Sequence, residues 1–222
     1  MRYSKMSRHR RNGQKGSFMV EFAIIGWTLF FLLAGVIQVG MNMGRAMTAH
    51  QVCRSANVLT VRGVDLNTPG NQQLITRVAS GLGLNQPGGW NADPNGNAVV
   101  YVSQVMLVGD LECSNGIGPT YDGTNSTCPN LGKYVITLRI GIGNTSRWAS
   151  LTGTPTSIGG AGGKFTDNDI CTKTGDVTTA FPAELGLAPD TYAYVSEVFA
   201  DTSNINFFNF LTPSAIYMRN LS

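Results

Sequence analysis

The longest apolar run in the chain lies near its N-terminus. It extends over 22 residues from Phe18 to Val39, and Glu21 and Gln38 are its main polar interruptions. An α-helix rises about 1.5 Å per residue, so this run forms a helix roughly 33 Å long, enough to cross a bilayer core of about 30 Å. The sequence therefore predicts a transmembrane helix over residues 18–39.

The helix is expected to continue beyond the apolar run. No proline occurs from Gly40 to Arg62, and small or apolar residues recur there at the three- and four-residue spacing of one helical face. These residues are Ala49, Val52, Ala56, Leu59 and Gly63. Gly63 is also a suitable residue to end the helix. We predict one long helix over residues 17–63, about 45 residues in length, whose second half is amphipathic.

The remainder, residues 64–222, has the pattern of an α+β domain. Thr68 as a cap and Pro69 at the first position predict a second helix over residues 70–82. Runs rich in β-branched and aromatic residues predict four strands, at 98–108, 134–142, 192–200 and 216–221. Antiparallel pairing of these strands, with one face of the sheet packed on the long helix, completes the predicted fold.

Two further expectations concern the body. In the second strand, alternation places five residues on one face: Tyr134, Ile136, Leu138, Ile140 and Ile142. Residues 144–190 are mostly Thr, Gly, Ser, Pro and Asp, which predicts a long, loop-rich surface insertion.

Charge separates the chain into two parts. Six of the 16 basic residues precede residue 16 with no acid among them, so the remainder carries 10 basic and 13 acidic residues, a net charge of −3. This leaves the body without the basic surface of a nucleic-acid-binding protein. A basic leader before an apolar helix predicts a cytoplasmic N-terminus and an exported C-terminus. A plain signal anchor and a cleaved secretory signal remain alternatives for this segment.

Histidine and acidic residues bear on catalysis. His9 and His50 are the only histidines, so no residue after position 50 supplies an imidazole for a Ser-His-Asp or Cys-His site or for a metal. We predict a protein that is not an enzyme and that has no cofactor or metal. A hydrolase that uses only carboxylates stays open in principle, through the acids Asp110, Glu112, Asp167 and Asp169.

All four cysteines fall on the predicted outer side of the membrane, where an even number favours two disulfides. Cys113 and Cys128 flank a turn-rich loop and are the natural pair, and closing a loop of about 15 residues contributes roughly 3 kcal/mol. Cys53 and Cys171 would then pair and join the long helix to the insertion. A metal site built from four thiolates is the competing interpretation, although the sequence has no Cys-x-x-Cys.

Glu21 gives the N-terminal segment a more specific meaning. A carboxylate within an apolar segment is energetically costly unless it is paired, so it indicates a function. Gly16, four further residues, then Glu21 and Phe22 resemble a class III prepilin signal. The resemblance implies that a membrane prepilin peptidase cuts between Gly16 and Ser17. It also implies that Glu21, one helical turn after the new α-ammonium of Ser17, pairs with the ammonium of a neighbouring subunit during filament assembly.

The residues after the apolar run narrow the resemblance. Arg45-Ala46-Met47, Gln51 to Asn57 and Arg62-Gly63 are similar to the post-membrane helix of TadE-like proteins, the minor pilins or pseudopilins of the tight-adherence (Flp) pilus. The resemblance covers residues 12–63 well and is weaker at 194–199. It implies a pilin-like fold and a role in assembling or priming a Tad pilus.

The same resemblance implies partners and a location. The partners are other pilin subunits, which contact the N-terminal helix and Phe22, the prepilin peptidase, the inner-membrane assembly platform and membrane lipid. The location is the bacterial inner membrane before assembly, and the periplasm or a surface pilus afterwards. The alternative is an uncleaved single-pass anchor that displays an adhesive or protein-binding domain, and cleavage at Gly16 with a requirement for Glu21 distinguishes the two.

Overall fold

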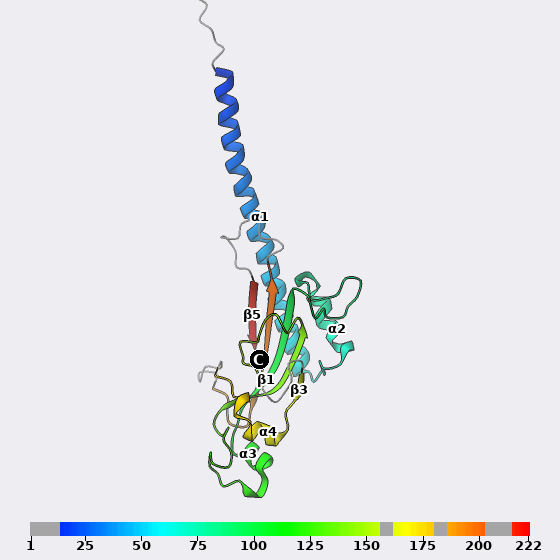
Figure 1. Ribbon diagram of the computed structural model, residues 1–222, viewed down its shortest axis with the longest axis vertical. Coiled ribbons are helices and arrows are strands. Elements are labelled where there is room, and N and C mark those ends of the chain that lie inside the picture. Colours follow the sequence, from blue (N-terminus) through cyan, green and yellow to red (C-terminus); the bar gives the residue numbers. More distant parts are fainter. Residues whose placement is uncertain (1–13, 156–161, 180–185, 203–214) are drawn as a thin grey trace, which may run out of the picture.

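The protein is a long helix attached to a sheet. The computed structural model describes residues 14–155, 162–179, 186–202 and 215–222. Helix α1, Gln14–Val61, projects from the body over its N-terminal half and packs against the sheet over its C-terminal half (Figure 1). The fold is α+β with a pilin-like arrangement, as predicted. Because α1 begins at Gln14, Gly16 and Ser17 lie in its first turn.

The C-terminal end of α1 is closed by the predicted glycine. Gly63 adopts a left-handed conformation with a φ of 76°. Its N–H donates to the Thr60 carbonyl at 2.9 Å, and the N–H of Val64 donates to the Leu59 carbonyl at 3.0 Å. These two bonds form a Schellman motif, which satisfies carbonyls that the helix end would otherwise leave unpaired.

The predicted second helix is present as α2, Pro69–Val78, followed by a 3₁₀ turn at Ser80–Leu82. Thr68 stands at the N-cap position, but its side chain makes no capping bond there. The Thr68 hydroxyl donates instead to the Asp65 carbonyl at 3.0 Å. Pro69 needs no acceptor for an N–H, so the start of the helix depends on the proline and not on a side-chain cap.

The four predicted strands are confirmed, and a short fifth strand joins them. The sheet order is β3-β2-β1-β4-β5, with antiparallel pairing throughout. The strands are β1, Ala98–Leu107; β2, Tyr134–Gly143; β3, Gly162–Lys164; β4, Tyr192–Asp201; and β5, Ala215–Leu221. β3 comes from the segment that the sequence presented as a surface insertion, and it pairs with β2 over three residues.

One face of the sheet packs on α1. The helix contributes four buried residues and the three central strands contribute seven, among them Ala98 of β1. The others are Ala49, Val52, Cys53 and Ala56 from α1, with Val100, Val102, Ile140, Ile142, Val198 and Ala200 from the sheet. The predicted amphipathic face of the helix is therefore confirmed, and its two alanines allow the helix to lie close to the strands.

A β-bulge changes which face the β2 side chains occupy. Gln104 of β1 pairs with Leu138 but Val105 pairs with Ile136, so Thr137 is an extra residue on β2. A bulge of this kind interrupts the two-residue alternation. Leu138, Ile140 and Ile142 pack in the α1 core, whereas Tyr134 and Ile136 belong to a second cluster. The prediction that all five residues share one face is wrong for the first two.

The second cluster lies at the end of the body far from the N-terminus of α1 (Figure 1). It includes two short helices absent from the sequence prediction, α3, Asp110–Ile117, and α4, Asp167–Thr172. A 3₁₀ turn follows each of them, at Gly118–Thr120 and Thr174–Asp176. The described parts of the expected surface insertion thus contribute core residues, including Phe165, Ile170 and Cys171.

At Gly143, at the end of β2, the backbone lies very close to neighbouring atoms. It has a φ of 100°, and a Cβ there would lie 2.5 Å from Leu84 Cδ1 and 2.6 Å from the Ala98 carbonyl oxygen. Gly132 also has a positive φ, 73°, but has open space around it. Left-handed strain alone costs about 1–2 kcal/mol, and overpacking adds about 1–3 kcal/mol.

We expect Gly143→Ala to lower the free energy of unfolding by about 2–5 kcal/mol and Gly132→Ala by only about 1–2 kcal/mol. Urea unfolding of the two variants measures the difference. Equal losses would show that the contacts of Gly143 with Leu84 and Ala98 do not constrain the fold.

Candidate functional site

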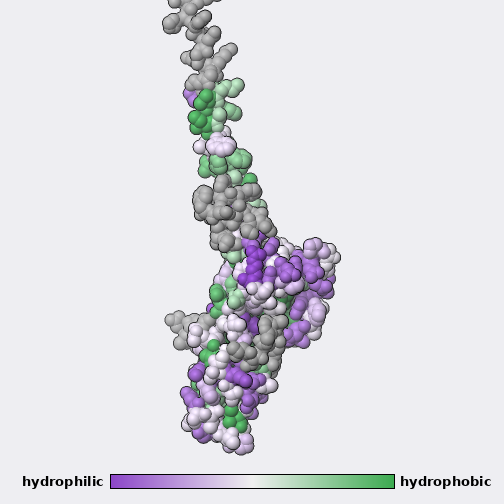
Figure 2. Space-filling view, viewed as in Figure 1, coloured by the Kyte–Doolittle hydropathy of each residue, from purple (hydrophilic) through white to green (hydrophobic). Residues whose placement is uncertain are grey.

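The N-terminal half of α1 is an exposed apolar rod. Figure 2 shows it green above a body that is mostly purple and white. Its large side chains are well exposed, for example Phe18 at 70%, Trp27 at 65% and Leu32 at 67%. The helix is apolar and long enough to cross a membrane, with a mean hydropathy of 2.2 in its most apolar stretch. Apolar surface on this scale indicates contact with lipid or with other helices.

Near its start, Glu21 interrupts this apolar surface and Phe22 continues it. Both are exposed, and Glu21 follows Ser17 by four residues within the same helix. Positions four apart lie on one face of a helix, so the geometry places the Glu21 carboxylate one turn from the Ser17 backbone nitrogen.

The comparisons with known proteins fall on this same segment. The family model described as TadE-like protein matches residues 16–56. The N-terminal segment of this chain is therefore similar to TadE-like proteins. The match includes Gly16, Ser17, Glu21 and Phe22, and it ends at Ala56 within α1, so it is shorter than the resemblance seen in the sequence and does not reach residues 194–199. No curated protein and no solved structure matches the chain.

The C-terminal half of α1 joins the apolar rod to the body. Arg45 Nη1 donates to the Asp201 carbonyl at 2.9 Å, at the end of β4. Further along the helix, the Ser196 hydroxyl donates to the Cys53 carbonyl at 2.8 Å, and Asn57 Nδ2 donates to the Asn220 carbonyl at 3.2 Å. These bonds, together with the apolar core beneath them, attach α1 to β4 and β5 over more than three turns.

The cysteines divide between the two cores. Cys113 and Cys128 form a disulfide, with their Cα atoms 5.9 Å apart. Cys53 and Cys171 are free and buried, so the expected Cys53–Cys171 bond is not formed. The reason is spatial, because Cys53 packs in the α1 core whereas Cys171 belongs to the second cluster. The structure thus brings three cysteines together and leaves the fourth apart.

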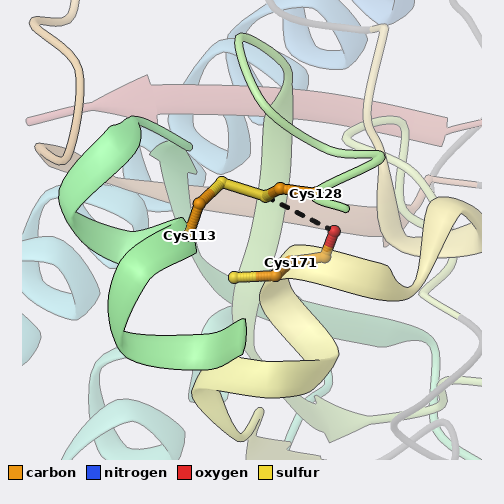
Figure 3. Close-up of side chains that lie close together, drawn as sticks. All are labelled: Cys113, Cys128 and Cys171. Carbon is orange, nitrogen blue, oxygen red and sulfur yellow. Dashed lines mark hydrogen bonds between the residues drawn. A yellow bond between two sulfur atoms is a disulfide. The ribbon is translucent and has the colours of Figure 1, made fainter. Parts of the chain in front are cut away.

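Figure 3 shows the three cysteines of the second cluster. Cys113 comes from α3, Cys171 from α4 and Cys128 from the loop between α3 and β2, and their sulfur atoms lie within 4.8 Å of one another. A metal would need thiolates, but two of the three sulfurs are joined in the disulfide. The remaining Cys171 thiol donates to the Glu112 carbonyl at 3.3 Å.

The electrostatics of Cys171 oppose ionisation. Burial raises the pKa of its thiol to about 11, and the negative charges of Glu112 and Asp167 add to this effect. Thiolate is the form that attacks disulfides and binds metals. Cys171 is therefore held as an unreactive thiol near neutral pH.

Polar groups fix the position of α3 and of the disulfide loop. The Asp190 carboxylate accepts from the N–H groups of Gly109 at 2.8 Å and Glu112 at 3.1 Å, at the start of α3. Buried Asn130 donates through Nδ2 to the Ile170 carbonyl at 2.8 Å. A carboxylate at a helix N-terminus is favourable both as an acceptor and through the helix dipole.

The four acidic residues considered as a possible hydrolase site lie in the first turns of two helices. Asp110 and Glu112 lie in the first turn of α3, and Asp167 and Asp169 in the first turn of α4. Asp110 accepts from the Tyr121 hydroxyl, and Asp169 accepts from Thr166 at 2.8 Å. Acids are common in the first turn of a helix because they complement its dipole. The TadE-like family is in general non-enzymatic.

Two buried charged residues on the other face of the sheet were not predicted from the sequence. Glu197 of β4 is fully buried, accepts from Ser150 and accepts from the Tyr217 hydroxyl at 2.9 Å. Arg139 of β2 is buried beside the Tyr101 ring. A charged residue alternating with apolar ones in a strand normally indicates a solvated face. Both strands show this pattern, so the sequence alone did not distinguish a buried charged residue from an exposed one.

Counting the free thiols tests the cysteine pairing directly. In urea without reductant, we expect a maleimide to label two thiols, Cys53 and Cys171, and to label four after reduction, as counted by intact mass. Reduction should also lower the free energy of unfolding by about 3 kcal/mol, because the disulfide closes a 15-residue loop. A Cys171→Ala control should leave one thiol before reduction. No labelling without reductant would contradict the structure.

Alkaline pH provides a second test. Burial, followed by the charge of Glu197, raises the pKa of Tyr217 well above its usual value, and the pKa of Cys171 is raised to about 11. The folded state holds both groups protonated, whereas the unfolded chain ionises them near their ordinary pKa values of 9.0 and 10.0. Their contribution to stability is thus complete below about pH 8.5; the part due to Cys171 is lost as the pH rises from 9 to 11, and the part due to Tyr217 is lost from pH 10 upward.

We expect the urea concentration at the unfolding midpoint to be lower at pH 10.5 than at pH 8. The Tyr217→Phe variant should show a smaller decrease. Tyr192→Phe, which changes an exposed tyrosine, should leave the fall as it is in the unmodified chain. Equal pH dependence in all three proteins would show that Tyr217 is not coupled to folding.

Proposed function

We propose that this protein is a minor pilin or pseudopilin that takes part in assembling or priming a Tad (Flp) type IV pilus. The TadE-like match over residues 16–56, on an exposed apolar helix, carries the proposal. A Tad-pilus-associated protein with an apolar N-terminal helix is what the family indicates. The finer role rests on the prepilin-like spacing of Gly16, Glu21 and Phe22.

The proposed topology follows from charge and length. Six basic residues before residue 16 favour a cytoplasmic N-terminus, and the apolar part of α1 is long enough to span the bilayer. The body would then lie outside, where the Cys113–Cys128 disulfide is stable. Before assembly the protein would reside in the inner membrane, with its body in the periplasm.

The proposed mechanism begins with cleavage after Gly16 by a prepilin peptidase. Cleavage creates an α-ammonium at Ser17, and Glu21 presents a carboxylate one turn later. In an apolar helix bundle an unpaired charge is strongly penalised, so pairing between Glu21 and the ammonium of a neighbouring pilin subunit sets the register of the helices. The assembly platform in the inner membrane would then move the subunit into the filament.

The continuity of α1 supports this mechanism. Force or displacement applied to the apolar half reaches the body through one helix without a break, from Gln14 to Val61. The bonds of Arg45, Cys53 and Asn57 to β4 and β5 transfer it to the sheet. The body would therefore move together with its membrane helix when the subunit leaves the bilayer.

The alternative is an uncleaved anchor that displays an adhesive or protein-binding domain. The observation that favours it is the uninterrupted helix through Gly16 and Ser17, which places the proposed scissile bond inside a helical turn. A peptidase must open this turn before it can cut. Processing at that bond is therefore the decisive difference between the two functions.

The N-terminal sequence of the protein recovered from host membranes tests the proposal. We expect it to begin at Ser17, and we expect Gly16→Ala to block processing. Gly26→Ala, at a helical glycine with nothing within 4 Å of an added Cβ, is the matched control and should be processed normally. A start at Met1 or Arg2 in the unmodified protein would favour the uncleaved anchor.

Glu21→Gln tests the next step in the same host. The variant should be processed at Gly16, because the peptidase recognises the glycine, but its incorporation into filaments should fall roughly tenfold or more because the ion pair is lost. Normal incorporation of a correctly processed Glu21→Gln protein would remove Glu21 from the mechanism.

A further inference from the structure

Three sulfur atoms meet where α3 and α4 pack together. Cys113, Cys128 and Cys171 are each fully buried, and their Sγ atoms lie within 4.8 Å of one another (Figure 3). Two of these sulfurs form the Cys113–Cys128 disulfide, and the third is a thiol. A thiol exchanges with a disulfide when its thiolate attacks one of the two bonded sulfurs. The fold therefore holds both partners of an exchange reaction in one buried cluster.

The Cys171 sulfur packs against the helix that carries Cys113. Cys171 Sγ donates to the Glu112 carbonyl oxygen of α3 at 3.3 Å. It also lies beside Gly116, where an added Cβ would come within 2.5 Å of it. Glu112 and Gly116 are one helical turn apart, and Cys113 lies between them in the sequence. The thiol is thus placed at the turn of α3 that supplies one sulfur of the disulfide.

The Cys128 sulfur lies beside an acceptor to which it cannot donate while it is in the disulfide. Cys128 Sγ is 3.9 Å from the Cys171 carbonyl oxygen, within hydrogen-bonding range for sulfur (Figure 3). A disulfide sulfur carries no proton, whereas a thiol is a weak donor. A Cys128 thiol would donate to this carbonyl from its present position. The site therefore offers an acceptor to a thiol at Cys128 as well as to the thiol at Cys171.

We propose that Cys171 exchanges into this disulfide, which gives a Cys113–Cys171 bond and a free Cys128 thiol. The Cys171 thiol first gives its proton to hydroxide. The thiolate attacks Cys113 Sγ, so that the Cys113–Cys171 bond forms as the Cys113–Cys128 bond breaks, and the electron pair of the broken bond leaves on Cys128. Cys128 then takes a proton from water. One disulfide and one thiol are present before and after, so the step needs no oxidant or reductant.

The movement that this exchange needs is small. A disulfide bond is about 2.0 Å long, so the sulfurs of Cys113 and Cys171 must approach by less than about 3 Å. Rotation of a cysteine side chain from one staggered χ1 position to another moves its sulfur by a comparable distance. Neither helix has to unfold for the new bond to form.

The exchange changes which segment is fixed covalently at the far end of the body. The Cys113–Cys128 bond joins α3 to the loop that follows it. A Cys113–Cys171 bond would join α3 to α4, two helices that already pack on one another. The loop that contains Cys128 would then have no covalent link to α3. This two-state centre does not depend on processing at Gly16, so it goes beyond the pilus function and is tested independently of it.

Burial and charge make the exchange slow near neutral pH. Burial raises the pKa of Cys171 to about 11, and the charges of Glu112 on α3, Asp167 on α4 and Asp190 before β4 add to this effect. The thiolate population, and with it the rate, should rise about tenfold for each pH unit below that pKa.

Disulfide mapping of the full chain in a non-ionic detergent tests the proposal. The protein is incubated without reductant at pH 7.5, 8.5 and 9.5, trapped with N-ethylmaleimide at pH 6, digested and analysed by mass spectrometry. We expect peptides joined through Cys113 and Cys171 to appear together with alkylated Cys128, at a rate that rises about tenfold per pH unit. The number of thiols should stay at two, because Cys128 replaces Cys171 beside the unchanged Cys53.

Three variants separate the exchange from the fold. Cys128→Ser should form the Cys113–Cys171 bond when it is treated with oxidised glutathione, and the serine hydroxyl can donate to the carbonyl that the released thiol would use. Cys171→Ala should keep the Cys113–Cys128 bond alone at every pH. Cys53→Ala is the matched control, because Cys53 is also free and buried but lies in the α1 core, and it should exchange at the rate of the unmodified chain.

Four results would each overturn the proposal. One is the absence of a Cys113–Cys171 bond at every pH, and another is a Cys128–Cys171 bond in its place. A third is entry of Cys53 into disulfides at the same rate, which marks exchange in the unfolded chain. The last is a folded Cys128→Ser protein that keeps three thiols after oxidation.

Discussion

Helix α1 passes through two environments that require opposite surfaces, and the rest of the structure depends on how it meets both. Its N-terminal half must present apolar side chains all round, since no part of the described body covers Phe18, Trp27 or Leu32. Its C-terminal half must present one narrow apolar face to the sheet. The change occurs without a kink-forming proline, so the two halves remain one rigid element. The Schellman motif at Gly63 then ends the helix where its contact with the sheet ends.

The sheet in turn separates two kinds of core. The face on α1 is apolar and contains small helix residues, whereas the opposite face holds Glu197 and Arg139 within a network of hydrogen bonds. The bulge at Thr137 redirects the start of β2 toward a third region, where the disulfide and the two short helices pack. A body of modest size therefore relies on burial against α1 and on a covalent link at the far end, because apolar residues are fewer there.

Elements with a long periodic signal could be predicted from the sequence. The Phe18–Val39 run, the Ala49 to Ala56 face and the four longer strands each extend over enough residues to show their period. α3 and α4 have eight and six residues, too few for a helical period to stand out, and their positions depend on Asp190 and Asn130 from distant segments. Cys171 could not be placed beside Cys113 for the same reason, because the contact between α3 and α4 is set by the fold and not by local pattern. The roles assigned to Gly16, Glu21 and Phe22 stay predictions, because they rest on the spacing of these residues along one helix.

The position of the TadE-like match explains how one chain combines these parts. It begins at Gly16 and ends at Ala56, so it contains the exposed apolar rod and the first residues that pack on the sheet. It stops before the sheet and the disulfide, which lie in the body. The matched segment therefore specifies one helix with two surfaces. Its first part is apolar all round and exposed, and its last part packs one apolar face on a sheet. Any sheet that offers apolar side chains to Ala49, Val52 and Ala56, and a carbonyl group to Arg45, meets that requirement. The face of the sheet away from α1 has no such constraint, which is why it can bury charged residues such as Glu197 and Arg139.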